Sequence, residues 1–213
     1  MATTKPGERK LQILQTLATM LEQPKGEKIT TAALAARIEV SEAALYRHFA
    51  SKAQMFEGLI EFIEQTVFSL VNQIAEREGG TAPDAANDAP TASGVDQGAG
   101  ARVRHAGKVA AMLIQFAEKN PGMTRVMVGD ALVFENERLQ QRMNQFFDKI
   151  ESIFRQNLRG AGQDNGSATP SVDAQVSASV LTAFVVGRLQ RYARSGFKRL
   201  PSEHLEASLA KML

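Results

Sequence analysis

The sequence predicts an all-α protein that carries a small DNA-binding unit at its N-terminus. Apolar residues recur at helical spacing in nearly every segment, and no stretch shows a convincing strand alternation. Residues 30–49 contain two short capped segments joined by a tight turn, the pattern of a helix-turn-helix. We therefore expect a helix-turn-helix domain over residues 1–50 and a larger helical domain over residues 51–213.

The composition allows a sizeable core and excludes several classes of site. The chain has 213 residues, of which 44% are hydrophobic, and a formal net charge of +2. Positive charge for a nucleic acid must therefore be placed locally. The absence of cysteine excludes disulfides, thiolate catalysis and Cys-based metal sites. The polar start has no apolar signal region, and no uninterrupted apolar run reaches about 18 residues, so we expect a soluble, cytoplasmic protein without a membrane span.

Two of the predicted helices have a clear sequence signal at one end. Leucines fall on one face of residues 8–22, and Pro24 ends that helix. Ser51 and Gln54 form a capping box at the start of a long helix over residues 52–77.

Residues 79–101 break the helical pattern. They contain one large apolar residue, Val95, so burial cannot offset the entropy lost on ordering, and we expect a mobile loop. Asn120-Pro121-Gly122 is a strong stop, and a second flexible loop is expected over residues 160–170. Helices are expected over residues 103–119, 123–133, 139–160, 171–196 and 202–213.

The helix-turn-helix prediction depends on its caps and on one small residue. Thr30 or Thr31 caps the first helix and Ser41 caps the second. Ala35 is small enough to let the two helices cross closely. Such a pair places its second helix in a major groove of DNA. The expected helices are residues 31–38 and 42–48, joined by Glu39 and Val40.

The second of these helices exposes side chains suited to DNA. Arg47 can donate two hydrogen bonds to O6 and N7 of guanine. Hydroxyl, imidazole and ammonium groups nearby suit phosphate oxygens, and Lys52 stands at a helix N-terminus, which also attracts phosphate. Two amphipathic helices of an ordinary bundle are the alternative, which the combined pattern disfavours. The expected DNA-binding residues are Thr30, Thr31, Ser41, Ala43, Ala44, Tyr46, Arg47, His48 and Lys52.

Residues 40–52 resemble the signature of the TetR family of dimeric bacterial DNA-binding proteins, in the pattern Val-Ser-x-x-x-Leu-Tyr-x-His-Phe-x-Ser-Lys. The resemblance implies three N-terminal helices for DNA and about six more for dimerisation and for binding a ligand or partner. One position departs from the family, which usually has Gly where Glu39 stands because that residue tends toward positive φ. A residue other than Gly there costs about 1 kcal/mol, so we expect a slightly strained turn.

Further segments are similar to the nucleoid occlusion factors of this family, namely residues 41–49, 59–64, 120–125 and 131–147. This similarity implies a homodimer on palindromic chromosomal sites, with higher-order assembly on DNA, that antagonises polymers of the division GTPase FtsZ. The FtsZ tail would dock on the face formed by the helices over residues 52–77 and 103–119. The implied contacts are Phe62, Lys119 and Asn120.

Each implied contact also has a plainer interpretation. Phe62 is by default a core aromatic, while Lys119 and Asn120 are by default a helix-terminal charge and a cap. In this family the late helices form the dimer, which suggests a close crossing at Gly187; a tolerated surface glycine is the alternative. The expected dimer interface is Phe184, Gly187 and Arg188.

No catalytic, metal or cofactor site is expected. His48, His105 and His204 are scattered without metal-ligand spacing, and no nucleophile elbow or phosphate-binding glycine loop is present. The leading hypothesis is a nucleoid-associated antagonist of FtsZ assembly that requires no small-molecule ligand. The alternative is a transcriptional repressor released by a small apolar ligand, which needs a cavity with convergent polar groups.

Overall fold

The computed structural model describes residues 6–23, 29–79, 93–133, 135–164 and 169–213. Over these residues the chain is helical with short turns and contains no strand, so the all-α prediction is confirmed. The helices are α1 (Pro6–Leu21), α2 (Thr31–Arg37), α3 (Glu42–Tyr46), α4 (Lys52–Gly79), α5 (Ser93–Lys119), α6 (Pro121–Met127), the 3-10 helix η1 (Asp130–Leu132), α7 (Glu137–Asp164), α8 (Pro170–Arg194) and α9 (Leu205–Met212).

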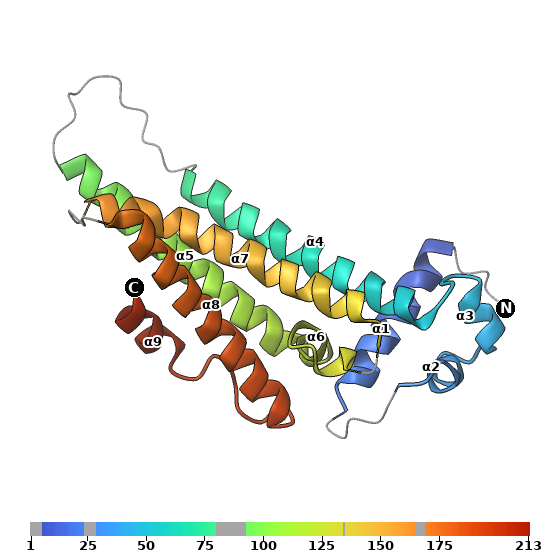
Figure 1. The fold of residues 1–213 in the computed structure, drawn as a ribbon. Helices are drawn as coiled ribbons and strands as arrows, with labels where there is room; N and C mark the ends of the chain where they lie inside the picture. Colours follow the sequence, from blue (N-terminus) through green and yellow to red (C-terminus); the bar gives the residue numbers. More distant parts are fainter. Residues whose placement is uncertain (1–5, 24–28, 80–92, 134, 165–168) are drawn as a thin grey trace.

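Two parts of the molecule follow one another along its length. Figure 1 shows α1, α2 and α3 at one end, and the long helices α4, α5, α7 and α8 running together through the rest. One continuous hydrophobic core joins both parts, because it includes Leu17 of α1 and Leu45 of α3 as well as Phe56, Phe146 and Phe154. The helix-turn-helix unit is therefore packed onto the body.

Two helices extend into segments expected to be loops. The helix α5 begins at Ser93, ten residues before the predicted start, and α7 continues past Gly160 to Asp164. The prediction of loops was wrong for these stretches because it considered burial alone. Once a helix is nucleated by packed residues, each further residue adds a hydrogen bond at little cost. The rest of the expected loops, residues 80–92 and 165–168, lies outside the described residues.

The region after α5 contains two short helices where one was expected over residues 123–133. Pro121 occupies the first turn of α6, where its missing N–H is no loss. Gly129 has a φ of 78°, which ends the α-helical path, and η1 follows it. The last helix also begins later than expected, at Leu205 instead of residue 202, because His204 adopts a φ of 53°.

One helix in the described part of the chain, α8, is long and apolar enough to cross a membrane on length and composition alone. Core helices pass the same test. Ala174, Leu181 and Val185 are buried, and α8 packs against α5 and α7. We therefore attribute the apolarity of these buried positions of α8 to helix packing.

The helix α6 connects the body to the end of α1. At Gly122 a Cβ atom would lie 2.0 Å from the carbonyl oxygen of Ala18, so only glycine permits this approach. The Arg125 guanidinium donates to the carbonyl oxygens of Leu21 at 3.4 Å and Gln23 at 3.2 Å. Arg125 thus binds backbone carbonyls at the last residue of α1 and just beyond it, where carbonyls of a helix end need partners from outside the helix. The same side chain pairs with Asp130 at 2.8 Å.

Replacement of Gly122 by Ala should therefore separate α1 from α6. The added methyl group meets backbone, which cannot move aside as a side chain can, so we expect a loss of about 1–3 kcal/mol in the free energy of unfolding. Urea denaturation measures this loss. Gly107→Ala is the matched control, since its Cβ would only touch the side chain of Leu213 at 3.4 Å. Equal stability of the two variants would contradict the close crossing.

Candidate DNA interface and partner face

The turn between α2 and α3 has the geometry that its sequence predicts. Glu39 has a φ of 55°, which confirms the expected left-handed residue at the position where the family uses glycine. The Glu39 N–H donates to Ala36 O at 3.2 Å, and the Val40 N–H donates to Ala35 O at 3.0 Å. These two bonds form a Schellman motif, which satisfies the last carbonyls of α2 and directs the chain into α3.

Both predicted caps of the helix-turn-helix are present. The Thr30 hydroxyl accepts from the Ala33 N–H at 3.1 Å, and the Ser41 hydroxyl accepts from the Ala44 N–H at 3.2 Å. Thr30 is thus the cap of α2, which settles the choice between Thr30 and Thr31. A capping hydroxyl uses its oxygen as acceptor and keeps its own hydrogen for another group. Both exposed caps can therefore donate to a phosphate oxygen while they stabilise the helices.

The short helix α3 presents a mixed surface. Leu45 and Phe49 are buried, as expected, and hold α3 against the core. Ala43, Tyr46 and Arg47 are exposed. The other two predicted contacts, Ala44 and His48, are half-buried instead of exposed. They line a small hollow of about 190 Å³ whose opposite wall includes Arg9 and Ile13 of α1, which explains their lower exposure.

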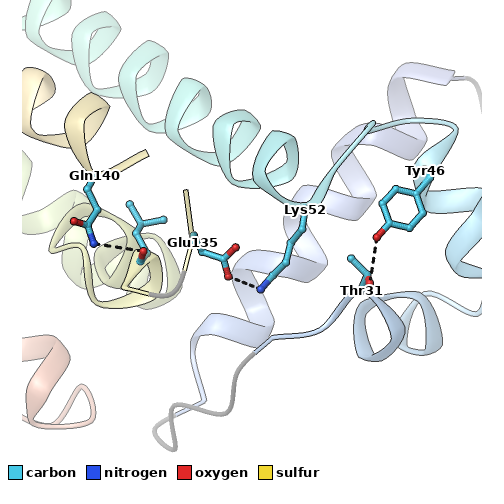
Figure 2. Close-up of polar contacts among 6 residues, drawn as sticks. Thr31, Tyr46, Lys52, Glu135 and Gln140 are labelled. Atoms are coloured by element: carbon cyan, nitrogen blue, oxygen red, sulfur yellow. Dashed lines mark hydrogen bonds and ion pairs between the residues drawn. The ribbon is translucent and has the colours of Figure 1, made fainter. Parts of the chain in front are cut away.

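A polar network joins the two helices of the DNA-binding unit. The Thr31 hydroxyl donates to Oε2 of Glu42 at 2.6 Å. The Tyr46 hydroxyl donates to Thr31 Oγ1 at 3.5 Å, as Figure 2 shows. Glu42 was absent from the predicted site, although an acidic residue in the first turn of a helix is a common stabilising feature. Each hydroxyl donates its one hydrogen within this network, so Thr31 and Tyr46 have to give up these bonds before they can donate to a phosphate.

Lys52 is engaged within the protein. Its ammonium group forms an ion pair with the carboxylate of Glu135, from the connection between η1 and α7. The two side chains are 21% and 12% exposed, and the Lys52 ammonium also lies 5.6 Å from the centre of the Phe56 ring. Figure 2 shows Lys52 directed toward Glu135, with Tyr46 and Thr31 on the other side of the start of α4. A phosphate contact at Lys52 therefore has to compete with Glu135.

The face of α4 that includes Phe62 is open and polar. Phe62 is 39% exposed, so its default interpretation as a core residue is wrong. Close along the helix, Glu64 binds the guanidinium of Arg142 through two bonds of 2.6 Å and 3.3 Å. The hydrogen bond to Glu64 raises the pKa of Arg142, against the effect of desolvation. This bidentate pair fixes α7 against α4, on a different side of α4 from Phe62, because residues two apart on a helix do not face the same way.

The end of α5 contributes the other two predicted partner contacts. The Asn120 side chain donates from Nδ2 to Phe116 O at 2.7 Å, which confirms its interpretation as a helix cap. Lys119 is exposed at the last position of α5. The helices α4 and α5 pack together, and we call their exposed sides, with Phe62 on one and Lys119 on the other, the composite face.

The residues predicted for the dimer interface have different surroundings. Arg188 lies 5.0 Å from the centre of the Phe184 ring and donates to Ser208 of α9 at 3.1 Å, so both residues are engaged within the protomer. Gly187 faces open space, because a Cβ atom at this position would have no heavy atom within 4 Å. The same helix exposes an apolar stripe that the prediction omitted, consisting of Val172, Val176 and Val180 at 60%, 57% and 52% exposure.

A cavity of about 710 Å³ lies where α6, η1, α7 and α8 meet. Its walls combine apolar side chains, such as Met143 and Phe147, with charged groups, such as Asp148 and Arg194. Its size is in the range of ligand sites.

Two family models match two separate stretches of the chain. Residues 25–59 match the model of the tetR family of bacterial regulatory proteins. Residues 101–212 match the SlmA-like model of the tetracyclin repressor-like C-terminal domain.

Similar curated proteins are nucleoid occlusion factors. The chain is 46% identical to the nucleoid occlusion factor SlmA of Aliivibrio fischeri strain MJ11 over 205 residues, which cover 96% of this chain and 93% of that protein. It is also 46% identical to SlmA of Vibrio cholerae serotype O1 over 207 residues, which cover 97% and 94%.

Two solved structures share the fold. The regulator FadR from Bacillus subtilis, in complex with stearoyl-CoA, aligns with a TM-score of 0.66 at 12% identity and covers 95% of this chain and 96% of its own. FadR from Bacillus halodurans aligns with a TM-score of 0.68 at 11% identity and covers 100% and 96%. Identities this low show a common fold alone.

The exposed guanidinium of Arg47 gives a prediction about sequence preference. Arg47→Ala should weaken binding to a preferred DNA site by about 1–3 kcal/mol and should relax base preference, because a bidentate guanine contact is lost. Fluorescence anisotropy on preferred and scrambled duplexes measures both effects. Lys52→Ala is the control and should weaken both duplexes alike. An equal loss on both duplexes for Arg47→Ala would refute its role in reading bases.

Proposed function

The chain belongs to the TetR family of bacterial regulatory proteins, among its nucleoid occlusion factors, and we propose that it binds palindromic chromosomal sites as a homodimer and there antagonises FtsZ polymers. The observation that carries this proposal is 46% identity to nucleoid occlusion factors over nearly the whole chain. The identity extends well beyond the helix-turn-helix, so it includes the body where a partner would bind. This function places the protein in the cytoplasm, on the nucleoid.

The DNA-binding role is supported by the arrangement of α2 and α3. Arg47 would donate to guanine in the major groove, and Ala43 and Ala44 leave room for α3 to approach the bases. His48 and the hydroxyl hydrogens of the two caps would bind phosphates, and Tyr46 and Thr31 would do so by exchanging their present bonds to Thr31 and Glu42 for bonds to phosphate. The whole chain has a net charge of only +2, so the affinity depends on these local contacts and falls as salt rises.

The FtsZ-binding role is supported by the composite face of α4 and α5. Phe62 offers a partly exposed ring for an apolar group, and Lys119 offers a positive charge for an acidic one. Phe62 stands ten positions after the start of α4, or about 15 Å along the axis. An extended tail peptide with both kinds of group fits such a face, since aromatic anchors supply buried area and charges supply complementarity.

The dimer is supported by the exposed side of α8. Val172, Val176 and Val180 recur every four residues and so lie on one face of the helix, where Gly187 continues the open surface. A contiguous apolar stripe of this kind marks an interaction site. A second copy that places its own α8 against the stripe would cover both faces around a twofold axis, which matches a palindromic site.

A ligand-released repressor is the second candidate, and the cavity of about 710 Å³ is the observation that favours it. Its wall includes Met127 of α6, the helix that holds α1. A ligand there would act on the DNA-binding unit. Long-chain acyl-CoA, added to the protein–DNA complex, tests this candidate: release of DNA would support it, and unchanged DNA binding would count against it.

The composite face gives a prediction about FtsZ. Phe62→Ala combined with Lys119→Asp should reduce FtsZ binding at least about tenfold, because the aromatic anchor and the complementary charge are both removed. Affinity for DNA and dimerisation should be unchanged. Sedimentation of FtsZ polymers with the variant and a palindromic duplex measures the interaction.

Two controls make that result interpretable. The variant's melting temperature must stay near that of the wild type, which is expected because Phe62 is not a core residue. Leu11→Ala combined with Lys198→Asp makes equivalent changes at exposed positions elsewhere in the chain and should bind FtsZ normally. Normal FtsZ binding by the stably folded test variant would place the site elsewhere. A wild-type protein that never binds FtsZ, with or without DNA, would favour the second candidate.

The stripe on α8 gives a prediction about assembly. Gly187→Leu should shift the protein from dimer to monomer, because a large side chain would hold the two copies of α8 apart, and Val176→Asp should do the same by placing a charge in the interface. Helix content should be retained, since Gly187 has open space in the protomer. Sedimentation velocity measures the dimer fraction. A stable dimer that still binds DNA in both variants would contradict this interface.

A further inference from the structure

The hollow between α1 and α3 combines cationic groups with apolar walls. Its volume is about 190 Å³, and it is lined by Arg9 of α1 and by Arg47 and His48 directly after α3. The remaining walls are apolar, among them the buried Ile13 and Leu45, and no carboxylate of the described residues lines it. Walls of low polarity strengthen the attraction between the cations and an opposite charge. The hollow therefore favours an anion.

The helix α3 and the turn after it present three sides, because residues four apart lie on the same side of a helix. Ala43 and Arg47 form the exposed central side, which faces outward. Glu42 and Tyr46 form the side toward α2, since both bind Thr31, and Figure 2 shows the Tyr46 ring directed toward it.

The third side of α3 faces α1. Ala44 and His48 are four residues apart, and both line the hollow with Arg9. The Arg9 side chain donates from Nη1 to Oε1 of Gln12 at 2.8 Å, which holds it along α1. Lys10 follows, with its ammonium group 5.7 Å from the centre of the Phe49 ring. The first turns of α1 thus bring two successive cations to this side of α3.

We propose that the hollow binds one phosphate of the DNA backbone through Arg9 and His48, on the strand opposite the one that faces Tyr46. This inference rests on the proposed function, in which α3 enters a major groove. That groove is about 12 Å wide and has a phosphate backbone along each edge, so a helix within it has one strand on either side. The central side, with Arg47, then remains for the bases.

The chemistry of Arg9 suits a phosphate. A guanidinium group has five N–H donors, and the bond to Gln12 uses one of them. Two others can donate in parallel to two phosphate oxygens, and the His48 imidazole can add a third bond. Because the Gln12 bond already orients Arg9, less side-chain entropy is lost on binding. A phosphate contact carries no sequence information, so Arg9 contributes affinity without base preference.

Replacement of Arg9 by Gln tests the phosphate contact. Affinity should fall at least about fivefold for both the palindromic duplex that the wild-type protein selects from a random pool and a scrambled duplex of equal length. The plot of log affinity against log salt should become less steep by about 1 per half-site. Fluorescence anisotropy over a range of salt concentrations measures both effects.

Two further variants serve as controls. Arg9→Lys keeps the charge and the aliphatic part of the side chain but loses the two parallel bonds, so it should keep the salt slope and bind with intermediate affinity. It also provides the comparison if Arg9→Gln lowers the melting temperature. Arg159→Gln removes the same charge from an exposed position in the last turns of α7, away from the DNA-binding unit, and should leave DNA binding unchanged (Figure 1).

A second measurement locates the phosphate. Neutral methylphosphonate groups, placed one at a time along both strands of the selected duplex, should weaken the wild-type protein at the phosphates that it contacts. One of these losses should vanish in Arg9→Gln, because that contact is already absent. A different loss should vanish in Tyr46→Phe, and the two positions should lie on opposite strands across one major groove.

Each outcome decides one part of the inference. Unchanged affinity of Arg9→Gln for both duplexes, or a loss confined to the selected duplex, would overturn the phosphate contact. Positions for Arg9→Gln and Tyr46→Phe on the same strand would overturn the assignment of the two sides of α3. A wild-type protein that selects no duplex from a random pool would overturn site-specific DNA binding in the proposed function. The salt slope of Arg9→Gln on the scrambled duplex would still decide whether Arg9 binds phosphate.

Discussion

The position of the DNA-binding unit is set by the approach of α6 to α1 at Gly122. Because a Cβ atom would overlap the Ala18 carbonyl, the backbones of the two helices meet without side chains between them. Arg125 then uses this proximity to bind the carbonyls at the end of α1. The shared core and the Lys52–Glu135 pair provide further links between the DNA-binding end and the body.

The polar side chains of the DNA-binding unit serve two purposes at once. Thr30 and Ser41 cap helices through their hydroxyl oxygens, so these two hydroxyls are held in place, with their hydrogens free, before DNA arrives. Groups that are already ordered lose less entropy on binding. Glu39 differs from these residues, because its left-handed conformation is strained and lowers the stability of the unit. In return, that conformation maintains the turn that orients α3. The turn at Glu39 thus lowers the folding stability of the unit slightly, and it keeps the DNA-binding surface in a fixed orientation.

What could be predicted from sequence was local. The caps, the turn at Glu39 and the burial of Leu45 depend on residues within a few positions of each other, and the structure confirms them. The ion pair of Lys52 joins residues 83 positions apart, and the exposure of Phe62 depends on how α4 meets its neighbours, so neither follows from spacing. The composition of residues 93–101 indicated a loop, but these residues belong to α5. Composition alone does not show that a packed helix continues into such a stretch. The half-burial of Ala44 and His48 depends on α1 in the same way.

The helix α4 begins at Lys52, beside the DNA-binding unit, and runs without a break for 28 residues into the body. A helix of this length spans about 42 Å, so it acts as a lever arm. A tilt of about 5° over that length displaces one end by about 4 Å, close to the rise of one base pair. In a dimer, small changes in angle between the two bodies would therefore shift the spacing of the two recognition helices by a base-pair step. The stiffness of α4 thus makes the choice of half-site spacing sensitive to events far from the DNA.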